Sequence, residues 1–240
     1  MPPIDPAPAP PPEFVPLTKL PHFDPRAVPV IGIDSHLPPV PHASLRPHVL
    51  RQRFLDSRPW TPEVRDEPRF TDRQLSQASV LVPVVMRDEP MLLLTERTTH
   101  LSTHSGQIAF PGGKRDATDR DAAHTALREA HEEIGLEADR AEVIGELPTY
   151  TTGTRFVITP VVALIDPQLR LAINPHEVAD AFEVPLAFLM NPAYHRRHAI
   201  EVGGVVREFF SMPYMQGSTE RFIWGATAGM LRNLYRFLAA

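Results

Sequence analysis

The chain has 240 residues, of which 42% are hydrophobic and 22% charged, and its formal net charge is −5. These proportions are ordinary for a soluble globular protein, and a chain of this length can bury a core without cross-links. The absence of cysteine excludes disulfides, a thiol nucleophile and a Cys-ligated metal site. The acidic balance does not favour nucleic acid as a partner, and no apolar run approaches the roughly 20 residues that cross a bilayer.

The prolines divide the chain into unlike parts. Of the 28 prolines, 15 fall in the first 50 residues and 8 after residue 100. Repeated proline removes amide donors, so we predict that residues 1–42 are an irregular tail, disordered at its start. The alternative for residues 1–12 is a proline-rich docking ligand. The start lacks a basic region followed by an apolar run, which argues against a signal peptide, and we expect a cytoplasmic protein.

The next segment predicts a helical lead-in over residues 43–77. Apolar residues near helical spacing predict a helix over 43–57, with Pro47 in its first turn. Two β-branched or apolar runs, 79–86 and 91–95, then predict a hairpin, because turn-forming residues separate them. A short strand follows at 107–110 and is broken by Pro-Gly-Gly.

The clearest helix is predicted over residues 119–134, where alanine, leucine and isoleucine recur on one face. Thr118 with Asp121 resembles a capping box, and Gly135 is placed to end the helix. Further along, we expect strands at 142–147, 156–163, near Leu171 and at 202–210, partial helix at 179–189 and a terminal helix at 222–238. The pattern predicts an α+β chain.

The acidic face of the helix over 119–134 is the most informative feature. Glu129, Glu132 and Glu133 share one face, and three carboxylates so close repel one another. A divalent cation relieves the repulsion, and hard oxygen ligands suit Mg²⁺ or Mn²⁺. The alternative is a solvated acidic face on which Arg128 pairs with Glu132. The glycines just upstream favour the metal, since a backbone without side chains admits phosphate oxygens.

The segment from Gly113 to Leu136 resembles the Nudix box, Gly-x5-Glu-x7-Arg-Glu-U-x-Glu-Glu-x-Gly-U, where U is bulky and aliphatic. The second half of that pattern is matched by Arg128, Glu129, Glu132, Glu133, Gly135 and Leu136. The first half departs from it: Asp119 stands where Glu is expected, eight residues rather than seven separate it from Arg128, and Ala130 stands at a U position.

A second segment, Leu93 to Gly113, resembles the additional motif of the coenzyme A pyrophosphatase branch of the Nudix family. The matching residues are Leu93, Leu94, Thr95, Arg97, His104, Gly106, Gln107, Phe110, Pro111, Gly112 and Gly113. Residues 223–228 are also similar to that branch. The resemblance covers roughly residues 78–240, which we therefore expect to form one Nudix hydrolase domain.

The resemblance implies a Nudix-type α/β/α sandwich with a mixed central sheet. It also implies hydrolysis of the diphosphate of coenzyme A, or of an acyl-CoA, to 3′,5′-ADP and 4′-phosphopantetheine. Metal ligands would be Glu129, Glu132 and Glu133, binding Mg²⁺ or Mn²⁺. Glu129 or Glu177 would take the proton of the attacking water, the alternative for Glu177 being a capping or surface glutamate. Arg128 would position Glu132 rather than touch substrate.

Substrate contacts are expected around the glycine turn. The residues concerned are Arg97, His104, Gln107, Gly112 and Gly113. An arginine fork recognises phosphate, whereas the alternative for Arg97 is a pair with Glu96. His104 and Gln107 could instead only order the loop. Trp224 is expected in the core rather than as a stacking platform, and Thr227 is expected to be buried.

Three other functions remain open from the sequence. One is a Nudix pyrophosphatase acting on ADP-ribose or NADH. Another is a catalytically silent module that binds coenzyme A or a protein. The third is an adaptor that uses the proline-rich tail. We expect a small-molecule substrate, no nucleic acid, no membrane, and a monomer or homodimer.

Overall fold

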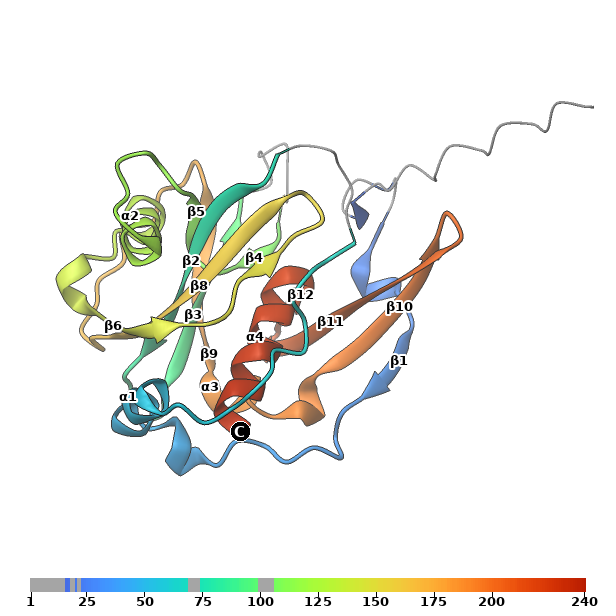
Figure 1. Ribbon diagram of the computed structural model, residues 1–240, viewed down its shortest axis with the longest axis horizontal. Coiled ribbons are helices and arrows are strands. Elements are labelled where there is room, and N and C mark those ends of the chain that lie inside the picture. Colours follow the sequence, from blue (N-terminus) through green and yellow to red (C-terminus); the bar gives the residue numbers. More distant parts are fainter. Residues whose placement is uncertain (1–15, 18–19, 21–22, 69–73, 99–105) are drawn as a thin grey trace, which may run out of the picture.

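A computed structural model describes residues 16–17, 20, 23–68, 74–98 and 106–240. Its larger sheet has eight strands and holds the centre of the molecule (Figure 1). Strands β2 and β8 run parallel along their whole length, whereas β3 and β6 pair antiparallel with them, so the sheet is mixed. The strands of this sheet are β2 (Ser76–Val85), β3 (Met91–Arg97), β4 (Ile108–Ala109), β5 (Gly112–Lys114), β6 (Ala141–Glu146), β7 (Tyr150–Thr151), β8 (Phe156–Ile165) and β9 (Val178–Pro185).

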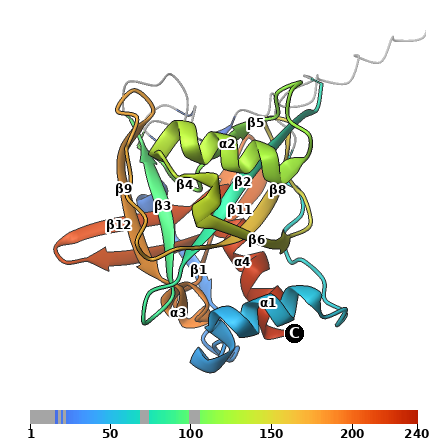
Figure 2. The same ribbon diagram turned by 90° about the vertical axis from the view of Figure 1, so that its left-hand side faces the viewer.

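Helices cover both faces of the larger sheet. Because side chains alternate along a strand, Val80, Val82 and Val84 of β2 pack on the side of α4 (Gly225–Ala239). Leu81 and Val85 of the same strand belong to the core under α2 (Ala122–Ile134). Figures 1 and 2 show α2 and α4 on opposite sides of the sheet. The predicted α/β/α sandwich with a mixed central sheet is therefore confirmed.

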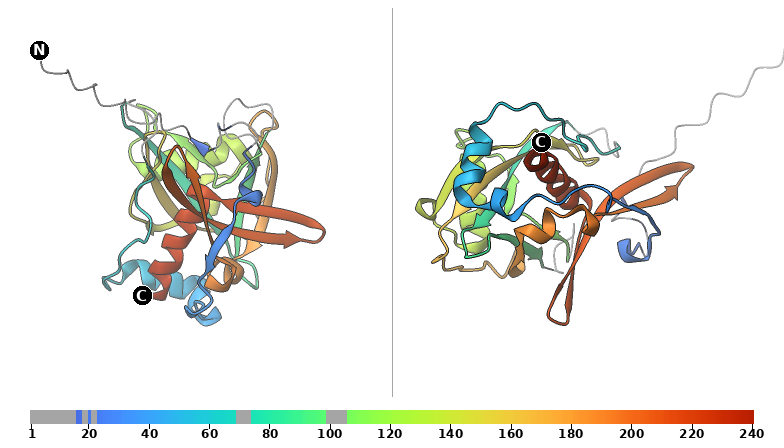
Figure 3. Two further views of the ribbon diagram at one scale, coloured as in Figure 1. Left: turned by 90° about the vertical axis from the view of Figure 1, so that its right-hand side faces the viewer. Right: turned by 90° about the horizontal axis from the view of Figure 1, so that it is seen from below.

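A smaller sheet of four strands packs beyond α4, and its hairpins extend away from the rest of the molecule (Figure 3). Its strands, in spatial order, are β1 (Val30–Ile33), β10 (Arg196–Val202), β11 (Val205–Gln216) and β12 (Thr219–Trp224). The prediction that residues 13–42 are irregular is wrong for β1, which pairs with β10 and so belongs to the sheet. The proline-rich start of the chain, residues 1–12, lies outside the described residues.

Helices α1 and α2 each begin a few residues later than predicted. Helix α1 (Pro47–Leu55) begins at Pro47, after a 3-10 turn at His42–Leu45, because proline suits the first helical position. Helix α2 begins at Ala122 rather than Asp119. Its N-cap is Asp121, whose carboxylate accepts from the His124 amide at 2.7 Å, so Thr118 is not the cap. Gly135 ends α2 with φ 67°, as predicted.

The second half of the chain contains more strand than predicted. Residues 178–185 form β9, not helix, because they pair with β3 over its whole length; only Leu186–Leu189 (α3) are helical. The expected strand near Leu171 is absent from the described chain. The segment predicted as one strand at 202–210 lies on two, β10 and β11, which join at Gly203 and Gly204 with φ 61° and 77°.

The lead-in packs on the C-terminal helix. Phe54 of α1 contacts Phe237 with ring centroids 4.6 Å apart, and Arg53 donates to the Phe237 carbonyl at 2.9 Å. Figure 2 shows α1 beside the C-terminal end of α4. Short 3-10 turns lie at Pro25–Ala27, Ala138–Arg140 and Pro192–Tyr194. The division of the chain at residues 42 and 77 stays a prediction.

Candidate active site

Helix α2 presents the predicted carboxylates because its opposite face is anchored in the core. Ala126, Ala130 and Ile134 are fully buried against the larger sheet. This packing turns Glu129, Glu132 and Glu133 away from that apolar stripe. The three differ in exposure: the side chain of Glu132 is 52% exposed, that of Glu129 15% and that of Glu133 4%.

Arg128 connects four groups at the edge of the site. It donates to both oxygens of Asp119, at 3.1 and 2.9 Å, and to Glu132 at 2.9 Å. It also lies 3.0 Å from Glu129 and donates to the Lys114 carbonyl at 3.1 Å. The guanidinium fork therefore holds the Glu129 and Glu132 carboxylates, and its pair with Glu132 is the contact that the sequence also allowed on a solvated acidic face.

Asp119 is the buried partner that fixes this arginine. Its side chain has no exposed surface and accepts from Arg128, from the Asp116 amide and from the His124 ring at 2.9 Å. The hydrogen bonds from Arg128 hold the pKa of the Asp119 carboxyl well below its usual range. The extra residue before Arg128 is accommodated because α2 starts at Ala122, so Asp119 lies in the preceding turn and reaches Arg128 from there.

Glu133 is the most buried of the three glutamates. Burial raises its pKa to about 7, against the opposing effects of Arg97 and of a hydrogen bond from the Gly112 amide. Its Oε2 atom has no hydrogen-bond partner among the described residues, and its Oε1 atom lies 3.6 Å from Arg97 Nη1. Burial also raises the pKa of Glu129.

The two glycines of β5 bring main chain against this helix. A Cβ atom on Gly113 would lie 2.5 Å from the Glu129 carboxylate, and one on Gly112 would lie 2.4 Å from the Ser79 carbonyl oxygen. Gly112 and Gly113 thus let β5 fit between strand β2 and the carboxylates. From the sequence, we expected phosphate oxygens to approach the backbone at these glycines. In the structure, the Glu129 carboxylate occupies part of the space next to Gly113.

Glu177 and Arg97 approach the same carboxylates from the other side. Thr98, which follows β3, donates its amide to the Glu177 carbonyl at 3.1 Å. Burial is the main cause of the raised pKa of Glu129 and of Glu133, and the Glu177 charge adds to it. Arg97 pairs with Glu133 and not with Glu96, whose carboxylate binds Arg221 instead at 2.8 Å.

Gln107 lies at the edge of a cavity beside the site, and its carbonyl accepts from the Arg97 amide at 3.0 Å. His104 lies outside the described residues. Thr227 is buried, as predicted, and donates to the Ile108 carbonyl at 3.0 Å. Trp224 is not a simple core residue, because it lines the cavity.

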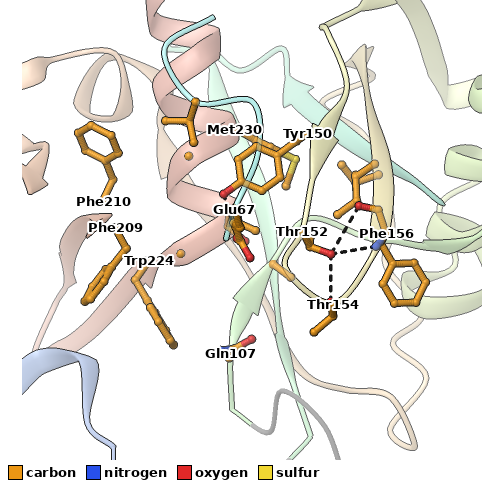
Figure 4. Close-up of a pocket in the computed structure, with 18 of the residues that line it drawn as sticks. Glu67, Gln107, Tyr150, Thr152, Thr154, Phe156, Phe209, Phe210, Trp224 and Met230 are labelled. Carbon is orange, nitrogen blue, oxygen red and sulfur yellow. Dashed lines mark hydrogen bonds between the residues drawn. The ribbon is translucent and has the colours of Figure 1, made fainter. Parts of the chain in front are cut away.

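The cavity has a volume of about 620 Å³ and lies between the larger sheet, α4 and the smaller sheet. Its lining includes Arg97, Gly112, Gly113 and Lys114, so it opens directly beside the α2 carboxylates. Figure 4 shows Phe209, Phe210 and Trp224 on one side and Thr152, Thr154 and Phe156 on the other. Sequence reasoning missed most of these residues because they are far apart in the chain and follow no motif.

The carboxylates have the chemistry of a cation site. An orphaned, buried carboxylate oxygen on Glu133 next to a second half-buried glutamate fits a hard divalent ion. Among the described residues no three Asp, Glu or His side chains are already grouped as a metal site. In this structure Glu132 and Glu129 pair with Arg128, at 2.9 and 3.0 Å.

Comparison with known proteins identifies the family of this chain. The model of the NUDIX domain matches residues 75–202, which hold α2, β5 and Glu177. The chain belongs to the Nudix family. Two Nudix hydrolases named NudL, both described as uncharacterized, are 41% identical to it. That of Enterobacter sp. (strain 638) matches over 158 residues, 66% of this chain and 80% of the relative. That of Salmonella dublin matches over 178 residues, 70% and 86% of the two chains.

A solved structure similar to this Nudix protein is the Ap4A hydrolase of Caenorhabditis elegans in a binary complex. It has 18% identity and a TM-score of 0.41, and covers 50% of this chain and 86% of its own. Hydrolases of the Nudix family generally use divalent metal ions and act on small molecules. In the part of the chain that the structure describes, no helix is both long and apolar enough to cross a membrane.

Proposed function

We propose that this Nudix protein hydrolyses the diphosphate of coenzyme A, or of an acyl-CoA, to 3′,5′-ADP and 4′-phosphopantetheine. The observation that carries the proposal is the position of Glu129 and Glu133, which flank the glycines of β5 at the opening of a cavity of about 620 Å³. The diphosphate would lie at this opening, with one organic arm of the substrate in the cavity.

Glu129, Glu132 and Glu133 would hold Mg²⁺ or Mn²⁺. When bound, the metal neutralises charge on the diphosphate and lowers the pKa of a bound water. Arg128 keeps Glu129 and Glu132 in place through its contacts of 3.0 and 2.9 Å. Its own position depends on Asp119, which receives two of its N–H donors.

A carboxylate near the metal ligands would accept the proton of the attacking water. Glu129 and Glu177 are the two candidates; burial is the main cause of the raised pKa of Glu133, and the charges of these two carboxylates add to it. Arg97 Nη1 lies 3.6 Å from Glu133, and its guanidinium would bind a substrate phosphate beside the carboxylates. Gly112, Gly113, Gln107 and, from its motif position, His104 complete the proposed substrate contacts.

The substrate rests on the resemblance of residues 93–113 to the additional motif of the coenzyme A branch. Of the residues matching that motif, Arg97, Gln107, Gly112 and Gly113 all line the cavity. A cytoplasmic location and a monomeric or homodimeric state are proposals from the sequence.

A substrate panel tests the proposal. The purified protein is incubated with Mg²⁺ and, in separate reactions, with coenzyme A, acetyl-CoA, ADP-ribose and NADH, and the products are separated by chromatography. We expect 3′,5′-ADP from the first two substrates at a higher kcat/KM than AMP from the others. Faster cleavage of ADP-ribose or NADH would assign the enzyme to another substrate class.

A further inference from the structure

One side of the cavity is a wall of aromatic rings from the smaller sheet. Trp224 lies 5.4 Å from Phe209, edge to face, and 5.8 Å from Phe23, measured between ring centroids. Phe209 in turn stacks on His198 at 4.8 Å with an interplanar angle of 3°. These contacts fix the Trp224 ring before any ligand arrives, which lowers the entropic cost of stacking a ligand on it.

A carboxylate belongs to the same cavity. Glu67, in the segment before β2, accepts from the Tyr150 hydroxyl at 2.9 Å and from the Gly153 amide at 3.0 Å, one bond to each oxygen. An ionised carboxylate can accept about four hydrogen bonds, so both oxygens keep acceptor capacity. Figure 4 shows Glu67 beside Tyr150, with Trp224 and Phe209 on the neighbouring wall.

The position of Glu67 is set by the backbone around it. Its amide donates to the Thr151 carbonyl at 2.8 Å, and the Thr151 amide donates to the Arg65 carbonyl at 2.8 Å. On the side of α4, Asn233 accepts from the amides of Glu63 and Val64 at 2.9 and 3.1 Å. The segment therefore forms a fixed wall of the cavity between β7 and α4.

The aromatic wall and the Glu67 carboxylate together indicate which part of a substrate could bind in the cavity. A hydrocarbon chain could pack on the aromatic wall, but it would remove water from Glu67 without replacing the lost hydrogen bonds. Charges of both signs line the cavity, namely Glu63, Asp66, Glu67 and Glu208 together with Arg97, Lys114, Arg197 and Arg207, so its charge alone does not select the ligand. A flat heterocycle with N–H donors can stack on Trp224 and donate to a carboxylate.

We propose that this cavity binds the adenine ring of the substrate, with Trp224 as the stacking surface and Glu67 as an acceptor for the exocyclic amine. The proposal deepens the proposed function and rests on it for the presence of adenine. It leaves the diphosphate at Gly112 and Gly113 and directs the pantetheine arm away from the cavity.

The test measures binding without hydrolysis. Kd values for AMP and for 4′-phosphopantetheine are determined by isothermal titration calorimetry in EDTA, on wild type and on Trp224→Leu. Loss of one base–aromatic stack weakens binding by about fivefold or more. We expect that loss for AMP, with 4′-phosphopantetheine unchanged, and partial recovery of AMP binding in Trp224→Phe. A matched control is Tyr194→Leu, because Tyr194 is 45% exposed and does not line the cavity.

The assignment would be overturned if Trp224→Leu, with unchanged circular dichroism, bound AMP as tightly as wild type. It would also be overturned if Trp224→Leu bound 4′-phosphopantetheine, and not AMP, more weakly than wild type. Trp224→Phe and circular dichroism together separate a folding defect from a lost stack. Because AMP is shared by several diphosphate substrates, AMP binding can depend on Trp224 even if coenzyme A is not cleaved. Conversely, coenzyme A can be cleaved while AMP binding ignores Trp224, so the two proposals fail separately.

Discussion

The buried carboxylate of Glu133 lowers the stability of the folded protein when it is ionised. Its carboxylate is buried, one oxygen lacks a hydrogen-bond partner among the described residues, and burial raises its pKa to about 7. Ionising it in the folded chain is therefore unfavourable. Since the folded pKa lies above the ordinary value of 4.5, the penalty is absent below about pH 4.5 and complete above about pH 7.

Replacing Glu133 by Gln should stabilise the metal-free protein. At pH 8 the penalty removed is at most about 3 kcal/mol, which corresponds to a rise of several degrees in Tm. The measurement is thermal unfolding in EDTA at pH 8 and at pH 5, where we expect the gain to shrink. Glu132→Gln is the control, because that side chain is 52% exposed and should leave Tm unchanged. A Tm for Glu133→Gln at or below wild type at pH 8 would contradict the burial argument.

For single residues, the sequence predicted which side chains share a helix face, but it did not predict their long-range contacts. The spacing of Glu129, Glu132 and Glu133 was enough to expect one carboxylate face, because helical periodicity is local. The pairing of Arg97 with Glu133 was not predictable, since it joins β3 to α2 across 36 positions of the chain. Trp224 was expected in the core, because nothing in the local pattern shows that a cavity opens beside it.

At the scale of elements, the contact between β5 and α2 builds the site. Gly113 faces the end of a flexible Glu129 side chain, whereas Gly112 faces the backbone of β2. A methyl group on Gly113 would contact a side chain that can move, whereas one on Gly112 would contact backbone that cannot. Their substitution therefore separates the geometry of the site from the stability of the fold.

Gly113→Ala should reduce hydrolysis with little loss of stability, because the methyl group displaces the Glu129 carboxylate. Gly112→Ala should lower Tm strongly, because its methyl group would lie 2.4 Å from the Ser79 carbonyl oxygen and the sheet would have to shift. Steady-state kinetics and thermal unfolding of both variants provide the check. If Gly113→Ala keeps wild-type kcat, Glu129 does not need its present position.

Elements with local signals were predicted and those with remote partners were not. The apolar stripe and Gly135 located α2, and β-branched runs located β2 and β8, since both signals lie within a few residues. Strand β9 was expected to be partly helical because its sequence is ambiguous; its state is decided by pairing with β3, more than 80 residues away. For the same reason β1 was not expected as a strand.

At the scale of the whole molecule, a buried polar network ties the N-terminal segment to the C-terminal helix. Arg232 donates to Glu63 at 2.8 Å and to the His195 ring at 3.1 Å, and pairs with Asp34 at 2.8 Å. The other ring nitrogen of His195 lies 2.8 Å from the Leu189 carbonyl, which fixes a neutral tautomer. Burial accordingly lowers the pKa of His195 to about 4. The cavity wall formed by Glu63–Glu67 therefore depends on this network.

This network predicts a pH dependence of stability. Because the folded pKa of His195 lies below its ordinary value of 6.5, the unfolded chain takes up a proton first as the pH falls. The contribution of neutral His195 to the free energy of unfolding is complete above about pH 7 and is lost toward pH 4. Between pH 7 and pH 5 the loss is about 2 kcal/mol. Urea unfolding of wild type and His195→Gln at both pH values measures it. Equal pH slopes for the two proteins would show that His195 is not the titrating group.

We propose that the α2 carboxylates serve hydrolysis of the diphosphate of coenzyme A. The most direct measurement is the rate of 3′,5′-ADP release from coenzyme A by wild type and by Glu133→Gln, with Mg²⁺ and with EDTA. We predict release by wild type only when Mg²⁺ is present, and a loss of at least about 100-fold in Glu133→Gln, as for the removal of a group that acts in the transition state. Wild-type activity in Glu133→Gln, or intact coenzyme A after prolonged incubation of wild type with Mg²⁺, would contradict the account.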